Sequence, residues 1–374
     1  MSELGLIVVW PNYLHCVDDV IGELKDDFEI INSYDIKWNK NILYQNFYRF
    51  YGDRLSTKSI KEKASRGSEF KLIVFKDSNP KYAFRTTARG IEKVNVNFFD
   101  LKKIFRRKFN TRFGIHGSNH ENETGRDLSL LLGINTEDFK KQNYEKWSGK
   151  VHRVERDITG SSGWDSLEQF FYFLNAVEPY LVLRNFSELD KKIEEIDDID
   201  FLVNNRHKFA LFSNAVKMSK GTERANYSIL VDKQKLHIDL RYIGDNYFDQ
   251  FWQQDCMNNK VLHDKGFYIM DEENQYFSLL YHALIHKRIM PEKYKKYFKF
   301  NNEELRDKLY KFMHKKGYLM VEPNDITLNF NKENGGDIKF SRPRRLRKKK
   351  GFNGFIKKTL YKLNNIIHFR RGPD

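Results

Sequence analysis

The sequence predicts an α+β protein with two domains and a basic C-terminal tail. Residues 6–31 follow the order strand, helix, strand, which is typical of a ferredoxin-like α/β sandwich. Residues 196–203 and 236–240 are short apolar runs interrupted by aspartates, and they predict strands of a second, mixed sheet. The polar segment 141–163 ends in glycine and serine and predicts a linker between the two domains. A chain of 374 residues, 40% of them hydrophobic, is long enough to bury two cores.

The first predicted domain spans residues 1–140. Its strands are continuous apolar runs that turn residues follow. A Gly-Ser turn at residues 117–118 precedes an apolar helix, and the backbone amides of such a turn are suited to bind phosphate. Strands are expected at residues 6–9, 28–31 and 70–75, and helices at residues 16–27 and 128–132.

The second predicted domain spans residues 164–340 and joins a mixed sheet to a helical C-terminal part. His282 and His286 are four residues apart in an expected helix, so they share one face. We interpret that face as a packing surface, with metal binding as the alternative. Lys287, at the exposed end of the same helix, is expected to reach a substrate phosphate. Helices are expected at residues 164–177, 275–287 and 302–316, strands at 196–203 and 236–240, a strand or helix at 180–185, and a strand pair at 318–329.

Three aspartates are the strongest functional signal in the sequence. Asp198 and Asp200 are two residues apart on one expected strand, so their side chains project from the same face. A neighbouring strand would bring Asp239 to them. Carboxylate oxygens suit Mg²⁺ or Mn²⁺, which usually bind one or two carboxylates together with substrate phosphates. The sequence therefore predicts a metal site that handles phosphate, and purely structural acids at a strand end are the alternative.

Around these acids, residues 165–300 resemble the nucleotidyltransferase-fold superfamily, which includes polymerase-β-like enzymes and LicD/fukutin-type phosphotransferases. The resemblance implies that Asp198, Asp200 and Asp239 form a catalytic metal site. The family's Gly-Ser turn before the paired acids is replaced here by Arg184-Asn185-Phe186-Ser187. Arg184 is expected to contact the donor together with Lys287.

The N-terminal region contains four short motifs: Trp10-Pro11-Asn12, Asn79-Pro80, Thr87-Ala88-Arg89-Gly90, and Ile115-His116-Gly117-Ser118-Asn119. In this order they resemble nucleoside diphosphate kinase over residues 5–135. The resemblance implies that His116 carries a phosphoryl group, that Arg89 binds phosphate and that Asp127 orients the histidine. Ser118, in the same motif, is expected to contact the ligand.

Two polar residues of that family are replaced in this chain. Trp10 occupies the position of the family's lysine. Phe113 occupies the position of the family's asparagine, three residues before the histidine. Losing two polar groups weakens charge stabilisation, which is usually the largest catalytic contribution. His116 is therefore expected either to be phosphorylated or only to bind a ligand. Six nearby cations are interpreted either as ligand contacts or as a solvated helix face: Arg85, Arg89, Lys102, Lys103, Arg106 and Arg107.

The formal charge of +15 is concentrated at the C-terminus. Residues 341–374 contain 12 Lys and Arg and one Asp, and so carry +11 of it. Residues 342–350 are a polybasic run, and residues 351–371 place apolar residues mostly three and four apart, which predicts an amphipathic basic helix. Such a tail can lie on an anionic membrane surface. Docking on the protein's own core and binding of nucleic acid are the alternatives.

The two cysteines, Cys16 and Cys256, are too few for a disulfide framework, which favours a reducing, cytoplasmic setting. No apolar run approaches the roughly 20 residues that span a bilayer. The first residues also lack the positive region of a signal peptide. We therefore expect a cytoplasmic protein, peripheral on the inner face of the cell membrane.

Together these features predict a Mg²⁺-dependent transferase. It would move a nucleotide-activated, phosphate-containing group onto a glycan or lipid-linked saccharide in surface polysaccharide biosynthesis. The first alternative is a nucleic-acid nucleotidyltransferase, against which the low charge of residues 1–340 counts. The second is a non-catalytic, membrane-attached binding protein built on decayed enzyme domains.

Overall fold

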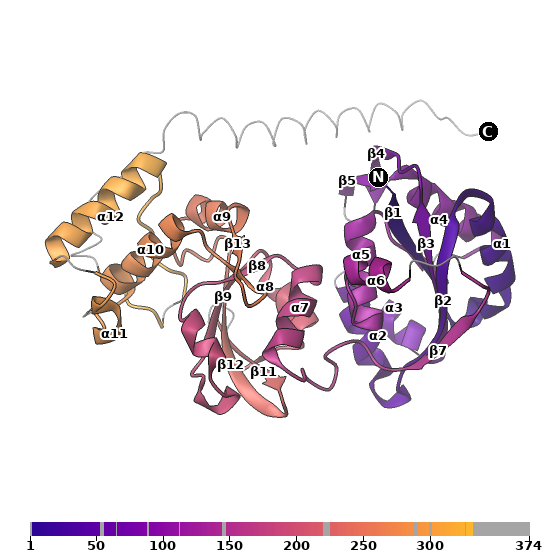
Figure 1. Cartoon of the computed structure of the whole chain (residues 1–374), viewed down its shortest axis with the longest axis horizontal. Coiled ribbons are helices and arrows are strands. Elements are labelled where there is room, and N and C mark those ends of the chain that lie inside the picture. The colour runs from indigo at the N-terminus through magenta and orange to yellow at the C-terminus, as the bar shows by residue number, and fades with distance from the viewer. Residues whose placement is uncertain are drawn as a thin grey trace. The chain divides into compact units, whose positions relative to one another are not determined.

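The protein is a mixed α+β structure with two larger sheets and one short hairpin (Figure 1). The computed structural model describes residues 2–52, 56–64, 66–87, 90–111, 113–143, 147–219, 225–287, 290–298, 301–325 and 327–331. The chain forms two compact units. The first comprises Met1–Ser219, Asn226–Leu240 and Leu262–Tyr268, and the second comprises the described parts of Lys220–Ala225, Arg241–Val261 and Ile269–Asp374.

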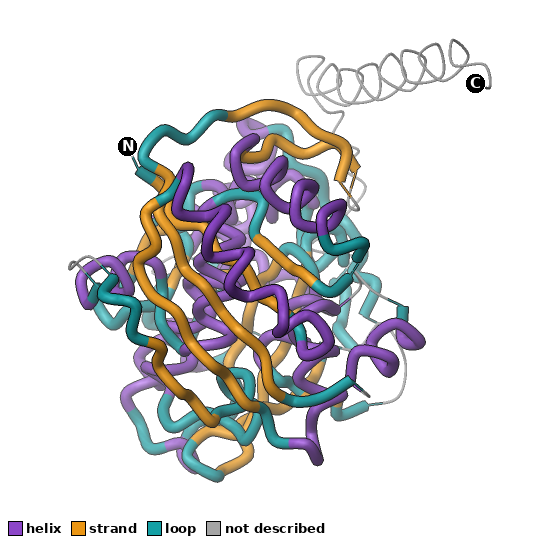
Figure 2. Tube along the Cα trace, turned by 90° about the vertical axis from the view of Figure 1, so that its right-hand side faces the viewer, coloured by secondary structure: helices purple, strands orange, loops and turns teal. Residues whose placement is uncertain are grey.

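The first sheet has five strands in the order β6-β1-β3-β2-β7, and its strands lie side by side in Figure 2. Neighbours are antiparallel except β2 and β7, which are parallel. In chain order β1, α1, β2, β3, α4 and β6 give the β-α-β-β-α-β arrangement of ferredoxin-like folds, as the sequence predicted. The strands are β1 (Glu3–Val9), β2 (Glu29–Lys37), β3 (Glu69–Asp77), β6 (Ile115–Gly117) and β7 (Val151–Glu155), and the helices are α1 (Val17–Asp27) and α4 (Val96–Lys108).

The predicted linker needs correction. Residues 151–155, within the segment 141–163, form β7 and pair with Ser33–Lys37 of β2. The edge of β2 otherwise leaves backbone donors and acceptors unpaired, so this segment completes the sheet. It therefore belongs structurally to the first sheet.

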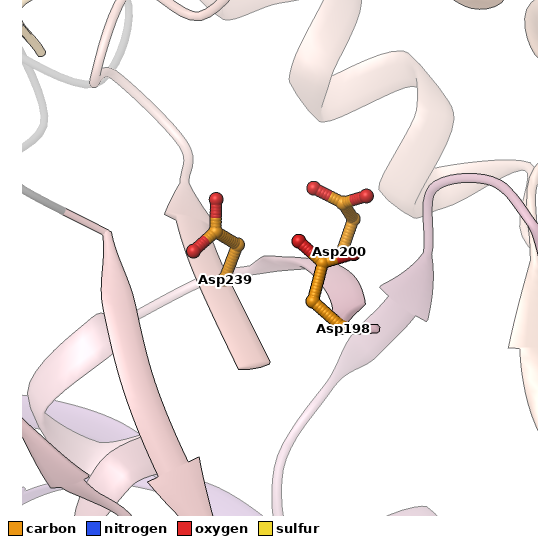
Figure 3. A group of neighbouring side chains, drawn as sticks. All are labelled: Asp198, Asp200 and Asp239. Carbon is orange, nitrogen blue, oxygen red and sulfur yellow. The ribbon is translucent and has the colours of Figure 1, made fainter. Parts of the chain in front are cut away.

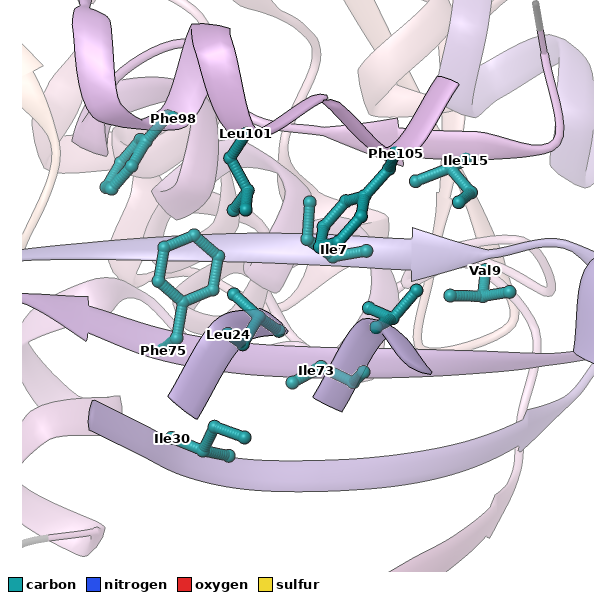
Figure 4. Packing of buried hydrophobic residues seen from close by; sticks show 11 residues of the cluster. Ile7, Val9, Leu24, Ile30, Ile73, Phe75, Phe98, Leu101, Phe105 and Ile115 are labelled. Atoms are coloured by element: carbon teal, nitrogen blue, oxygen red, sulfur yellow. The ribbon is translucent and has the colours of Figure 1, made fainter. Parts of the chain in front are cut away.

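Helices α1 and α4 cover one face of this sheet. Alternate residues of β1 and β3 point toward them, as Figure 4 shows for Ile7, Ile73 and Phe75. Leu24 of α1 and Phe105 of α4 are fully buried against these strands. The opposite faces of β1 and β3 are buried as well, because every residue from Leu4 to Val9 except Gly5 has its side chain inside the core.

An aromatic cluster fills the region where β1 ends. Trp10 is buried and packs against Trp38, Phe47 and Phe70, with ring centroids 5.8, 5.0 and 4.8 Å away. Residues on helix α2 supply much of this cluster because its aromatic side chains recur at helical spacing. The remaining elements here are α2 (Leu43–Tyr51), α3 (Thr57–Ala64), the hairpin β4 (Tyr82–Thr87) and β5 (Gly90–Asn95), α5 (Glu121–Leu132) and α6 (Thr136–Gln142).

The second sheet has the strand order β10-β11-β12-β9-β8-β14-β13. The predicted helix at 164–177 begins at residue 167, because Ser166 caps it by accepting a hydrogen bond from the Gln169 amide. Phe170 and Phe173 of that helix pack on Trp164. The strands are β8 (Tyr180–Val182), β9 (Ile199–Val203), β10 (Val216–Lys217), β11 (Asn226–Val231), β12 (Gln234–Tyr242), β13 (Val261–Leu262) and β14 (Tyr268–Ile269), and the helices are α7 (Leu167–Val177) and α8 (Arg206–Ser213).

Helices are the main described elements of the second unit. Trp252 is fully buried and stacks on Tyr318, with ring centroids 5.3 Å apart. The predicted helix at 302–316 is confirmed as α12, whereas the predicted strand pair at 318–329 is wrong, since the described residues there form no strand. None of the described helices has the length and apolar composition needed to cross a bilayer. The helices are α9 (Gln250–Asn258), α10 (Glu272–Tyr281), a π-helical turn (His282–His286), α11 (Glu292–Lys295) and α12 (Asn302–Lys316).

Candidate functional site

Two neighbouring strands of the second sheet carry the three aspartates. Asp198 directly precedes β9, Asp200 is its second residue, and Asp239 lies in β12, which is hydrogen-bonded to β9. The alternation of side chains along β9 puts Asp198 and Asp200 on one face. The flanking Ile199 and Phe201 are buried on the other face of the strand.

The three carboxylates converge, as the sequence predicted. Each offers one oxygen, and these oxygens all lie within 4.8 Å of one another. In Figure 3 the carboxylate of Asp239 faces those of Asp198 and Asp200 across a short gap. Asp200 is buried, whereas Asp198 and Asp239 are half-buried. The arrangement is therefore a cluster of three acidic side chains, two of which are partly exposed to solvent.

Burial and like charges act together on Asp198. Burial first, and then the negative charges of Asp200 and Asp239, raise the pKa of its carboxyl to about 6, while the charge of Arg184 acts in the opposite direction. Burial and like charges both disfavour the ionised carboxylate. A cation at this site would lower the pKa again.

Arg184 occupies a different place from the one expected. Its Nη2 donates to Oδ1 of Asp200 at 2.5 Å, and both side chains are largely buried. The guanidinium therefore neutralises one of the three carboxylates, rather than standing apart as a donor-binding residue. The backbone places it there because Leu183, its neighbour in sequence, donates its amide to the Asp200 carbonyl at 2.8 Å.

Lys287 and the histidine pair lie in the second unit. Lys287 is exposed at the end of the π-helical turn, where the sequence analysis placed it. His282 and His286 are buried, and the Tyr247 hydroxyl lies 2.6 Å from Nδ1 of His282. The His286 ring packs 4.5 Å from the Tyr247 ring. These contacts support the packing interpretation of the two histidines.

His116 lies on β6 and is held by an acid, as the resemblance implied. Its Nε2 is 2.7 Å from Oδ2 of Asp127, and Arg126 Nε donates to the other oxygen of Asp127 at 2.8 Å. Burial alone would raise the pKa of Asp127, but the charge of Arg126 and the hydrogen bond with His116 bring it below its ordinary value. Asp127 thus stays ionised and fixes the orientation of the imidazole.

Ser118 does not have the role predicted for it. Ser118 is 1% exposed, and its hydroxyl accepts a hydrogen bond from the Leu6 amide at 3.2 Å and lies 2.9 Å from the Thr124 hydroxyl. A hydroxyl enclosed in this way cannot reach a ligand. Ser118 instead joins β1 to α5.

Two backbone amides at the start of α5, where the sequence predicts a phosphate seat, are capped by side chains. Glu123 accepts from the Asn119 amide at 2.8 Å, and the ring of His120, the N-cap residue, accepts from the Glu123 amide at 3.2 Å. Side-chain caps of this kind satisfy the donors that an anion would otherwise bind. Glu123 is itself ion-paired with Arg126 at 3.0 Å.

Two further residues belong to the motifs of the kinase-like region. Arg89 lies outside the described residues. Trp10, at the position of the family's lysine, is a core residue, and its Nε1 donates to the Tyr51 hydroxyl at 2.7 Å. A cation that the sequence analysis did not single out, Lys63, lies over the Trp10 ring. No motif surrounds Lys63, so only its tertiary contacts identify it.

Comparison with known proteins adds little. No protein-family model matches the chain, and no curated protein matches it. A solved structure that it resembles in part is a transition state mimic of nucleoside-diphosphate kinase from Borrelia burgdorferi with bound vanadate and ADP. The sequence identity is 14% and the TM-score 0.22, and the match covers 38% of this chain and 97% of that chain. The chain is thus a weak structural neighbour of that enzyme, and a likeness of this size says nothing about activity.

Proposed function

We propose that this chain is a Mg²⁺- or Mn²⁺-dependent transferase of a phosphorus-containing group. The convergence of the Asp198, Asp200 and Asp239 carboxylates within 4.8 Å is the observation that supports it most. The donor would be a nucleotide-activated group, and the acceptor a glycan or lipid-linked saccharide of the kind used in surface polysaccharide biosynthesis.

The residues present fit a hard divalent cation. All three candidate ligands are carboxylates, the donor type that Mg²⁺ and Mn²⁺ prefer. Arg184 pairs with Asp200 only, so the cluster keeps a net negative charge. Burial, and after it the charges of Asp200 and Asp239, raise the pKa of Asp198. When bound, the cation would polarise a phosphoryl oxygen. Asp198 and Asp200 would hold it, and Asp239 would complete the ligand set or accept the proton of the acceptor hydroxyl.

Binding of Mn²⁺ is expected to strengthen as the pH rises through about 6, because the Asp198 carboxyl, with its pKa of about 6, must lose its proton. The metal-free protein should show the opposite trend. The raised pKa stabilises its fold fully below the unfolded value of 3.8, and this stabilisation is lost as the pH rises through about 6. Calorimetry should give an affinity about tenfold lower near pH 5 than near pH 7. Absence of Mn²⁺ binding at both pH values would contradict the metal site.

The donor and acceptor are identified by incubating the full chain with Mn²⁺, a panel of nucleotides and nucleotide-activated alditols, and saccharide acceptors. Mass spectrometry then reads which species are bound and which are transferred. Transfer to a saccharide supports the proposal. Nucleotide addition to a nucleic-acid primer instead would establish the alternative class of nucleotidyltransferase.

His116 supports a second candidate function, a phosphohistidine centre or phosphorylated-ligand site in residues 5–135. The specific observation is the chain of contacts from His116 through Asp127 to Arg126. Because Asp127 holds Nε2, a phosphoryl group would bond to Nδ1 of the ring. Asp127 would stabilise the positive charge that the imidazole gains during transfer.

A labelled nucleoside triphosphate is expected to leave an acid-labile, alkali-stable label on the protein. His116→Ala should abolish that label, and His15→Ala, an exposed histidine elsewhere in the same domain, should retain it. Phosphoramidates hydrolyse in acid and survive alkali, so this pattern distinguishes them from phosphoserine. A label that persists in His116→Ala, or no label at all in the wild type, would remove the kinase reaction from the proposal.

Attachment to the membrane is proposed on the sequence of residues 341–374 alone, since they lie outside the described residues. Seven Lys and Arg between positions 342 and 350 should each contribute about 1 kcal/mol near an anionic surface. In a flotation gradient the full chain is expected to rise with phosphatidylglycerol vesicles. A variant with these seven residues changed to Gln is expected to stay in the bottom fraction. Equal flotation of the two proteins would show that the polybasic run does not hold the chain on lipid.

A further inference from the structure

A buried lysine lies on aromatic rings close to His116. Lys63 of α3 is 6% exposed, and its Nζ is 5.2 Å from the centroid of the Trp10 ring and 5.1 Å from that of Tyr51. The same nitrogen donates to the Phe113 carbonyl at 2.5 Å. The Tyr51 ring also packs edge-on with the His116 ring, at a centroid distance of 5.8 Å. Cation–π contacts and one carbonyl give the ammonium partial compensation only.

Two arginines add positive charge at the same place. Arg66, in the turn after α3, and Arg106, on α4, both act on the Lys63 ammonium. Burial first, and then these two charges, lower the pKa of Lys63 to about 7. Burial also lowers the pKa of Arg106. Within the described part of the chain, none of the three cations lies within ion-pair distance of a carboxylate.

The cluster borders a pocket. Its wall includes Lys63 and Arg66 together with Trp10, Asn12, Tyr13 and Phe113. A buried cation without an acidic partner is unfavourable, since its desolvation is not repaid by an opposite charge. An anion in the pocket would supply that charge.

We infer that this pocket binds a small dianion of the phosphate-monoester class, with Lys63 and Arg66 as its direct contacts and Arg106 as a supporting charge. The Tyr51 ring, next to this pocket, packs against both Lys63 and His116. Only the ligand class, a phosphorylated molecule, rests on the second candidate function. Anion binding itself does not require His116 to react. Trp10 occupies the position at which the resemblance implies a lysine. In this chain the Trp10 ring instead contacts the ammonium of Lys63, which belongs to α3.

Sulfate is a suitable probe, because it is a tetrahedral dianion whose charge is constant near neutral pH. Calorimetry on the full chain should detect sulfate binding that Lys63→Met weakens at least about tenfold, the amount expected for losing one charged hydrogen bond. Lys61→Met, an exposed lysine on the same helix, should leave the affinity unchanged. Lys63→Met should also be no less stable than the wild type, because it removes an uncompensated buried charge.

Arg66→Gln provides a second test that does not depend on how well Lys63→Met folds, since Arg66 is exposed and its replacement leaves the core intact. It should weaken sulfate binding severalfold. The affinity of the wild type should also fall as the pH rises from about 6 to about 8.5, because Lys63 loses its proton in this range. Arg66 and Arg106 are the charged groups that act on Lys63, Tyr13 lies in the pocket wall, and Tyr51 and His116 are the titratable side chains packed next to them.

His116→Asn separates the two proposals. It should abolish the phosphoryl label and retain sulfate binding that depends on Lys63. If the label is absent but sulfate binding is lost in Lys63→Met, the kinase reaction fails and the anion site stands. Wild-type affinity in both Lys63→Met and Arg66→Gln, or no sulfate binding by the wild type, would overturn the anion site.

Discussion

Asp198→Asn and Asp239→Asn are each expected to lower divalent-dependent transfer by about a thousandfold, because each removes one ligand charge from the metal site while keeping the side-chain volume. Both side chains are half-buried, so the fold should tolerate the amides. Initial transfer rates at saturating Mn²⁺ give the size of the effect, and circular dichroism verifies the fold. Wild-type rates in either variant would show that the acids are structural.

Asp197→Asn is the matched control. Asp197 is exposed, is adjacent to Asp198 in sequence and is not part of the carboxylate cluster, so its replacement should change the rate less than about twofold. Asp200→Asn is less informative than the other two. It leaves Arg184 buried without its partner, and breaking such a pair usually costs about 3–5 kcal/mol of stability.

Arg49→Met is expected to lower the free energy of unfolding of the first compact unit by about 3 kcal/mol or more. The buried guanidinium of Arg49 donates to the carbonyls of Phe212, Thr159 and Leu211 at 2.6, 2.8 and 3.2 Å. Methionine has a similar length but no donor, so three buried carbonyls lose their partner, each at a cost of about 1 kcal/mol or more. Urea denaturation followed by tryptophan fluorescence measures the change.

Arg153→Met serves as the control for this variant. Arg153 lies exposed on β7, where an unpaired arginine contributes little, and its replacement should change the unfolding free energy by less than about 0.5 kcal/mol. A loss below about 1 kcal/mol in Arg49→Met would mean that water replaces the guanidinium at these carbonyls.

The sequence alone identified the acids of the candidate metal site and most elements of the first sheet. It could do so because these features are local. Side-chain alternation along β9 fixes the relation of Asp198 to Asp200, and the apolar runs of β1 and β3 are continuous over whole strands. The capping box of Asn301 and Glu304 likewise marks the start of α12 within four residues. The match of Asp127 to His116 came from resemblance, and the 2.7 Å contact agrees with it.

Tertiary structure alone decided the features that depend on residues distant in sequence. Residues 151–155 become a strand only because the edge of β2 is available for pairing. Arg184 meets Asp200 through the antiparallel pairing of β8 with β9, and Lys63 reaches the Phe113 carbonyl 50 residues away. The sequence specifies the charge and size of a side chain, but tertiary packing determines which residues lie next to it. The cost of burying it, and therefore its chemical role, follows from those neighbours.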